Sequence, residues 1–121
     1  MRSAILISAL ALPMSAHAVD PDAYRIRSAA ELVRVCSVQP SEPDHATAIA
    51  FCHGVLAGAY GYYAASTTVA EQFVCLPDPP PARSQIASDF VAWAQGRPQH
   101  MQNGAIDTLF RYAVERFPCK K

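Results

Sequence analysis

Four cysteines lie downstream of an export signal, and this combination sets the strongest limit on the fold of the chain. The chain has 121 residues, enough for one small domain whose hydrophobic core alone gives marginal stability. Thiols oxidise outside the cytoplasm, so the cysteines predict two disulfides. Four cysteines allow three pairings. The order of the predicted helices favours Cys36–Cys52 and Cys75–Cys119.

Redox chemistry and metal binding are the alternative roles of these cysteines. No C-x-x-C motif occurs, and the Cys52-His53 pair has no second ligand at zinc-site spacing. We therefore expect structural disulfides, no metal site and no cofactor. Chain entropy predicts about 3 kcal/mol of stabilisation from the shorter disulfide loop and somewhat more from the longer one.

The export signal occupies residues 1–18. Arg2 precedes an apolar run over 4–12, and Ala16-His17-Ala18 has the small-residue pattern of a signal-peptidase site. The run is shorter than the roughly 20 apolar residues that span a bilayer. We predict cleavage between Ala18 and Val19, release into the periplasm with no membrane partner, a flexible leader over 19–27 and a single domain over 28–121.

Apolar residues recur at helical spacing in four segments. Ser28 and Glu31 form a capping-box pattern before the first segment, and Asn103 is the predicted N-cap of the last. The longest uncharged stretch, 46–70, contains a histidine and three glycines, which favours the central helix of a soluble bundle over a membrane span. We predict an all-α fold, a small disulfide-stapled bundle of about four helices, over 28–36, 41–66, 84–95 and 103–117.

The second predicted helix carries two different stripes. The larger residues, expected to face the core, are Ile49, Cys52, Leu56, Ala59 and Tyr63. A stripe of small residues predicts the close approach of another helix, or alternatively a kink or break near Gly58 and Gly61. The small residues are Ala50, Gly54, Ala57 and Gly61. Tyr60, Tyr62 and Tyr63 point to more than one side, so at least one must face outward or toward another subunit.

Charge and catalytic motifs indicate a binding protein rather than an enzyme. Ten basic and ten acidic residues leave no basic excess, which argues against a nucleic-acid partner. His53 has no carboxylate one helical turn away, and His45 and His100 are expected at the surface. The chain has no Gly-rich phosphate loop and no G-x-S-x-G or H-E-x-x-H motif.

Four short motifs in order carry a resemblance to a known family. They are Glu31-Leu32-(x)3-Cys36, Phe51-Cys52-His53-Gly54-(x)3-Gly58, Val74-Cys75-Leu76-Pro77 and Phe117-Pro118-Cys119-Lys120. With the preceding signal peptide, this set resembles the Rap/Tai-type immunity proteins, periplasmic antitoxins that accompany type VI secretion amidase effectors. The resemblance covers most of the mature chain, from about Ser28 onward.

The resemblance implies a small helical fold with disulfides, often dimeric, and no chemistry of its own. It implies binding to a cell-wall amidase toxin, whose active-site groove a family member blocks. This sequence departs from the family pattern at His53, where we expect leucine or a similar residue, and in the rigid Pro79-Pro80-Pro81 segment.

We predict that the connection over 67–83 supplies the contacts with the partner. Its prolines pre-organise it, and a rigid scaffold presents such a loop with little ordering cost. The predicted contact residues are Phe73, Leu76, Asp78, Pro79, Pro80 and Pro81. The alternative is that the loop is a mere connector held by Cys75.

Two other functions compete with that of an immunity protein. The first is a small periplasmic chaperone of the acid-stress kind, which exposes apolar surface when its carboxylates become protonated. The second is an enzyme or metal-binding protein. An amidase-like effector encoded beside the gene favours the immunity protein, suppression of aggregation at low pH favours the chaperone, and stoichiometric metal favours the third function.

Overall fold

The computed structural model describes residues 19–120, so the predicted signal peptide lies outside the described residues. This part of the chain contains four α-helices, three short 3-10 helices and two isolated β-bridges, but no strand. The all-α prediction is confirmed. In chain order the elements are η1 (Pro21–Arg25), α1 (Ala29–Cys36), α2 (His45–Ser66), η2 (Val69–Glu71), α3 (Arg83–Gln95), η3 (Pro98–His100) and α4 (Ala105–Arg116).

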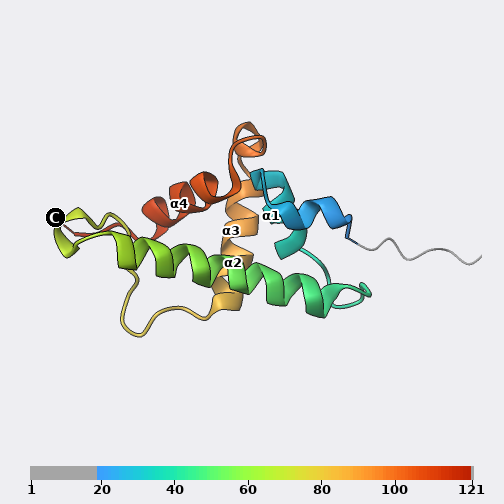
Figure 1. Ribbon diagram of the computed structural model, residues 1–121, viewed down its shortest axis with the longest axis horizontal. Helices are drawn as coiled ribbons and strands as arrows, with labels where there is room; N and C mark the ends of the chain where they lie inside the picture. Colours follow the sequence, from blue (N-terminus) through green and yellow to red (C-terminus); the bar gives the residue numbers. More distant parts are fainter. Residues whose placement is uncertain (1–18, 121) are drawn as a thin grey trace, which may run out of the picture.

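The helices pack around the shortest of them, α1. In Figure 1 the long helix α2 runs along the molecule, α1 and α4 lie on one side of it, and α3 runs across it. The eight-residue α1 contacts α2, α3, α4 and η1, and its Leu32 and Val35 are completely buried. Phe90 of α3 and Tyr112 of α4 complete the centre of the core.

The start of α1 follows half of the predicted capping box. The Ser28 hydroxyl accepts a hydrogen bond of 3.3 Å from the Glu31 backbone N–H. The Glu31 carboxylate, however, accepts a hydrogen bond of 2.6 Å from the backbone N–H of Arg27, the residue before the N-cap, and not from that of the N-cap Ser28 itself. The hydrogen bond from the Arg27 side chain lowers the pKa of Glu31 below its usual value.

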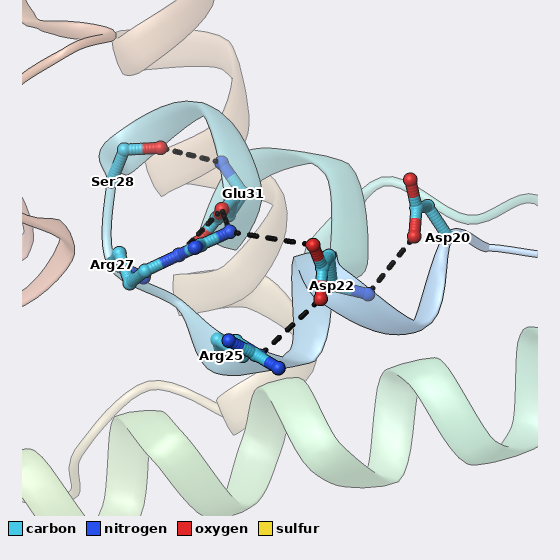
Figure 2. A network of polar contacts seen from close by, with 6 residues as sticks. All are labelled: Asp20, Asp22, Arg25, Arg27, Ser28 and Glu31. Atoms are coloured by element: carbon cyan, nitrogen blue, oxygen red, sulfur yellow. Dashed lines mark hydrogen bonds and ion pairs between the residues drawn. The ribbon is translucent and has the colours of Figure 1, made fainter.

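Residues 19–27 form a packed part of the domain, which differs from the expected flexible leader. A network of polar contacts, shown in Figure 2, joins η1 to the start of α1. Asp22 forms ion pairs with Arg25 at 3.3 Å and with Arg27 at 3.9 Å, and Arg27 pairs with Glu31 at 2.7 Å. Ala23 is buried, so the segment adds apolar contacts to the core as well as surface ion pairs.

The second helix buries residues of the predicted core stripe, but its glycines do not have the predicted role in close helix packing. Cys52, Leu56 and Tyr63 are buried. The helix begins at His45, after a turn, and is continuous through Gly58 and Gly61, so the break considered as an alternative does not occur. A Cβ atom on any of the glycines of α2 would meet nothing within 4 Å, so no helix of the described chain packs closely against them.

The structure contains the two disulfides that the order of elements favours. Cys36–Cys52 joins α1 to α2 across a separation of 16 residues, and both half-cystines are buried. Cys75–Cys119 joins the connection before α3 to the residues after α4 across 44 residues. None of the helices within residues 19–120 has the length and apolar character needed to cross a membrane.

We predict that loss of the longer disulfide destabilises the domain strongly. In the double substitution Cys75→Ala with Cys119→Ala, the unfolded chain regains the freedom of a 44-residue loop, worth about 4 kcal/mol. Urea unfolding under oxidising conditions measures the loss. The control His53→Ala changes a half-buried side chain and should cost less than about 1 kcal/mol. Equal losses in the two proteins would contradict the prediction.

We also predict that Gly54→Ala stabilises the domain. The added methyl group meets no other atom, and alanine favours the helix over glycine by about 1 kcal/mol. The expected result is a rise of about 4–8 °C in the melting temperature of the oxidised protein. A fall would show that the exposed backbone at Gly54 makes a contact that a methyl group disrupts.

Candidate partner-binding surface

The connection between α2 and α3, called the 67–83 loop below, is attached to the body of the domain at its middle. Cys75 is held by its disulfide, and its backbone N–H donates to the Phe117 carbonyl at 2.8 Å. The Cys119 N–H donates to the Phe73 carbonyl at 3.3 Å, and Val74 forms an isolated bridge with Pro118. The middle of the loop thus forms a single β-bridge with the residues after α4.

Tyr63, near the end of α2, gives this loop a second attachment. Its hydroxyl oxygen accepts from the backbone N–H groups of Phe73 at 2.8 Å and Val74 at 3.0 Å. The ring of Tyr63 lies 5.0 Å from that of Phe73 and 5.1 Å from that of Phe110, measured between centroids. Aromatic pairs at this spacing add to the energy of burial. The loop backbone near Phe73 is therefore ordered before any partner binds.

An apolar groove runs between α2 and α4, and we call it the α2–α4 groove. Its volume is about 580 Å³. Tyr62, with 78 % of its surface exposed, Phe73, with 45 %, and Ile106, with 39 %, line it and face solvent. Gly58 lies in its wall, and the absence of a side chain there keeps the groove open. The remaining lining residues are Ile26, Val55, Ala59, Tyr63, Ser66 and Phe110.

A second hollow, which we call the loop cavity, lies beneath the proline segment and has a volume of about 490 Å³. Leu76, Pro80 and Pro81 cover it from the 67–83 loop. Tyr112 contributes to its wall, and the buried Tyr112 hydroxyl has no hydrogen-bond partner within the described residues. Burial raises the pKa of Tyr112 to about 12, so the hydroxyl remains a neutral donor at physiological pH.

The predicted contact residues divide between these two hollows. Phe73 lines the α2–α4 groove, whereas Leu76, Pro80 and Pro81 line the loop cavity. The exposed residues Asp78 and Pro79 line neither hollow. The structure therefore places four of the six residues beside apolar hollows.

The helices also contribute residues to this surface, which the sequence pattern did not predict. The spacing of Ile106, Leu109, Phe110 and Ala113 predicts one core-facing stripe on the last helix, yet Ile106 is exposed and lines the α2–α4 groove. Arg83 and Ile86 from α3 line the loop cavity. The tyrosines gave the only signal, because three of them within four residues cannot all face the core: Tyr63 is buried and Tyr62 is exposed.

The histidines of the described chain lie apart from one another. His45 Nδ1 is 2.8 Å from the Val38 carbonyl oxygen, and the His100 ring stacks on Trp93 with centroids 5.8 Å apart. His53 is half-buried on α2. Among residues 19–120, no three side chains of histidine, cysteine, aspartate or glutamate are grouped so as to hold a metal ion. Apolar side chains line most of both hollows, and Arg83 adds one charged side chain to the wall of the loop cavity.

Comparisons with known proteins give one match. The family model of the Rap1a immunity proteins matches residues 28–119. Comparisons with curated proteins and with solved structures found no match. The match begins just before α1 and ends at Cys119 of the second disulfide. It includes every residue that lines the two hollows except Ile26. On this evidence the chain belongs to the family of Rap1a immunity proteins.

Proposed function

We propose that this protein is a periplasmic immunity protein that binds a secreted cell-wall amidase of type VI secretion and blocks its active-site groove. The observation that carries the proposal is the family match over residues 28–119, which implies a protein effector as partner. The match favours this function over an acid-stress chaperone. The amidase and the periplasm come from the resemblance and from the predicted signal peptide.

The attachment of the 67–83 loop supports binding through a pre-organised surface. A loop that must become ordered on binding loses affinity, because immobilising each flexible side chain costs roughly 0.5–1.5 kcal/mol. Here the disulfide, the Tyr63 hydroxyl and the Phe117 carbonyl already hold the loop at Phe73, Val74 and Cys75. The loop therefore presents Phe73 and Leu76 without a large loss of freedom.

The two hollows support binding through apolar anchors of the partner. Hot spots of protein interfaces are large side chains that fill desolvated pockets on the other protein. The α2–α4 groove and the loop cavity are both lined mainly by apolar groups and lie side by side, since Ala59 and Phe110 line both. We infer that side chains of the effector enter one or both hollows, with Phe73 and Tyr62 contributing aromatic contacts.

The proposed function needs no reaction at this surface. Inhibition of an amidase requires only that the bound protein cover the groove where the peptidoglycan substrate must enter. A stoichiometric complex that stops amide cleavage tests this proposal directly, using purified oxidised protein and hydrolases encoded beside its gene. Light scattering of the free protein tests the homodimer that the resemblance implies.

We predict that Gly58→Leu weakens binding while leaving the fold intact. The leucine side chain would occupy the open α2–α4 groove, and leucine favours the helix over glycine. Affinity for the effector, measured by calorimetry, should fall at least about tenfold, which is roughly 1.4 kcal/mol.

The matched control is Gly54→Leu, one helical turn earlier. Gly54 is equally open but lines neither hollow, so affinity should change less than about threefold. The proposed surface would be wrong if both variants stayed folded and both bound as tightly as the unsubstituted protein. It would also be wrong if both stayed folded and lost affinity to the same extent.

We predict that Tyr63→Phe frees the loop near Phe73. The substitution removes the acceptor of two backbone N–H groups, and leaving the buried Val74 N–H without a partner costs about 1–3 kcal/mol. Hydrogen exchange at the Phe73 and Val74 amides should become faster, and affinity for the effector should fall. Tyr60→Phe serves as the control for the exchange measurement alone, because Tyr60 is partly exposed but also lines the loop cavity. Unchanged exchange in Tyr63→Phe would contradict the prediction.

A further inference from the structure

The backbone of Val19 lies against the start of α2, although the two are 25 residues apart in the sequence. The Val19 backbone nitrogen donates to the Asp44 carboxylate oxygen Oδ2 at 2.9 Å. The Val19 side chain is only 3 % exposed and belongs to the hydrophobic core. Both the nitrogen and the side chain of this residue are therefore held by the folded domain.

Asp44 occupies the N-cap position of α2 but does not serve as an ordinary cap. Its side chain makes no capping hydrogen bond to the helix. Aspartate at this position ordinarily accepts from a backbone N–H in the first turn. The carboxylate lies at the positive end of the helix dipole, a place that suits a negative charge. The Asp44 carboxylate is thus an anion placed toward the Val19 nitrogen.

The segment that carries Val19 is well attached. Asp20 accepts from the backbone N–H of Asp22 at 3.0 Å and caps η1, and the ion pairs of Asp22, Arg25 and Arg27 join η1 to α1 (Figure 2). The segment that places the Val19 nitrogen beside Asp44 is therefore part of the folded domain.

We propose that signal-peptide cleavage between Ala18 and Val19 converts this hydrogen bond into an ion pair that stabilises the mature protein. Hydrolysis adds one water molecule across the peptide bond and leaves a carboxylate on Ala18 and an ammonium group on Val19. An α-amino group has an ordinary pKa of about 7.7–8.0, so it is largely charged at neutral pH. A contact of 2.9 Å to a carboxylate is then a charge-assisted hydrogen bond.

The proposal rests on the predicted signal peptide and is independent of the effector. It makes stabilisation conditional on export in the same way as the disulfides, because neither the ammonium group nor the oxidised cysteines exist in the cytoplasmic precursor. The precursor is therefore the less stable form of the chain, which suits a protein that crosses the inner membrane.

The sign of the pH dependence follows from the ammonium group. Pairing with Asp44 raises the pKa of the amine in the folded state, so the stabilisation is complete below about pH 7.7 and is lost as pH rises through the folded pKa. The elements that meet here also carry Asp20, Asp22 and Arg25 on η1 and Glu42 and His45 beside the start of α2. Carboxylates and imidazoles as classes titrate below this range, and guanidinium groups titrate above it.

The test compares oxidised proteins that begin at Val19 with proteins that retain residues 15–18. Each is prepared as the unsubstituted chain, as Asp44→Asn and as the control Asp20→Asn, whose amide oxygen still accepts a hydrogen bond. At pH 7 the chain that begins at Val19 should melt about 4–8 °C higher than the extended chain. Asp44→Asn should abolish this difference, Asp20→Asn should preserve it, and raising the pH to about 10 should remove it.

Equal melting temperatures of the two unsubstituted chains at pH 7 would overturn the proposal, even if Asp44→Asn failed to fold. A difference that survives in Asp44→Asn would also overturn it. The exported protein gives an independent check, because its intact mass must correspond to a chain that begins at Val19; a different first residue would leave no ammonium group beside Asp44.

Discussion

The Cys75–Cys119 bridge holds together the end of the molecule where α2, the 67–83 loop and the residues after α4 meet. Without this bridge, the loop near Cys75 would be held by the Tyr63 hydroxyl and by backbone hydrogen bonds with Phe117 and Cys119. Hydrogen bonds to water can replace each of these contacts, so each contributes little net stability. Both hollows need the loop in place, since Phe73 lines one and Leu76 covers the other. The candidate binding surface therefore depends on a covalent bond that forms only in an oxidising compartment.

The other end of the molecule contains the other disulfide and the proposed ion pair of the amino terminus. There the Cys36–Cys52 bridge lies in the core between α1 and α2, and the Val19 backbone contacts Asp44 at the start of α2. A small domain has little apolar surface to bury, so additional covalent and ionic contacts form a large part of its net stability. In the proposal that the chain is exported and cleaved before Val19, oxidation and cleavage together complete the fold outside the cytoplasm.

The parts of the fold that were predictable are those with local causes. Ser28 caps α1, and the helical spacing of Cys52, Leu56 and Tyr63 placed all three in the core. The packed segment 19–27 was not predictable, because its order depends on ion pairs with α1 and on the contact with Asp44. At the candidate surface, the loop residues Phe73 and Leu76 were predicted, but the participation of Ile106 was not, because its helical spacing matches that of a core residue.

Residue order alone thus specifies the four helices, the favoured disulfide pairing and the membership in an immunity family, because apolar spacing and the order of cysteines and helices can be read as patterns along the chain. Among the four helices a side-chain cap contributes only at α1, since α4 begins after Gly104 and not after the predicted cap Asn103. The fold in three dimensions decides which small residues face solvent. Gly58 could have admitted another helix of the chain, yet it opens onto a groove, since the helices pack around α1 and leave that part of α2 uncovered. Whether a glycine permits close packing or leaves a hollow depends on what lies opposite it, and this depends on contacts between distant segments.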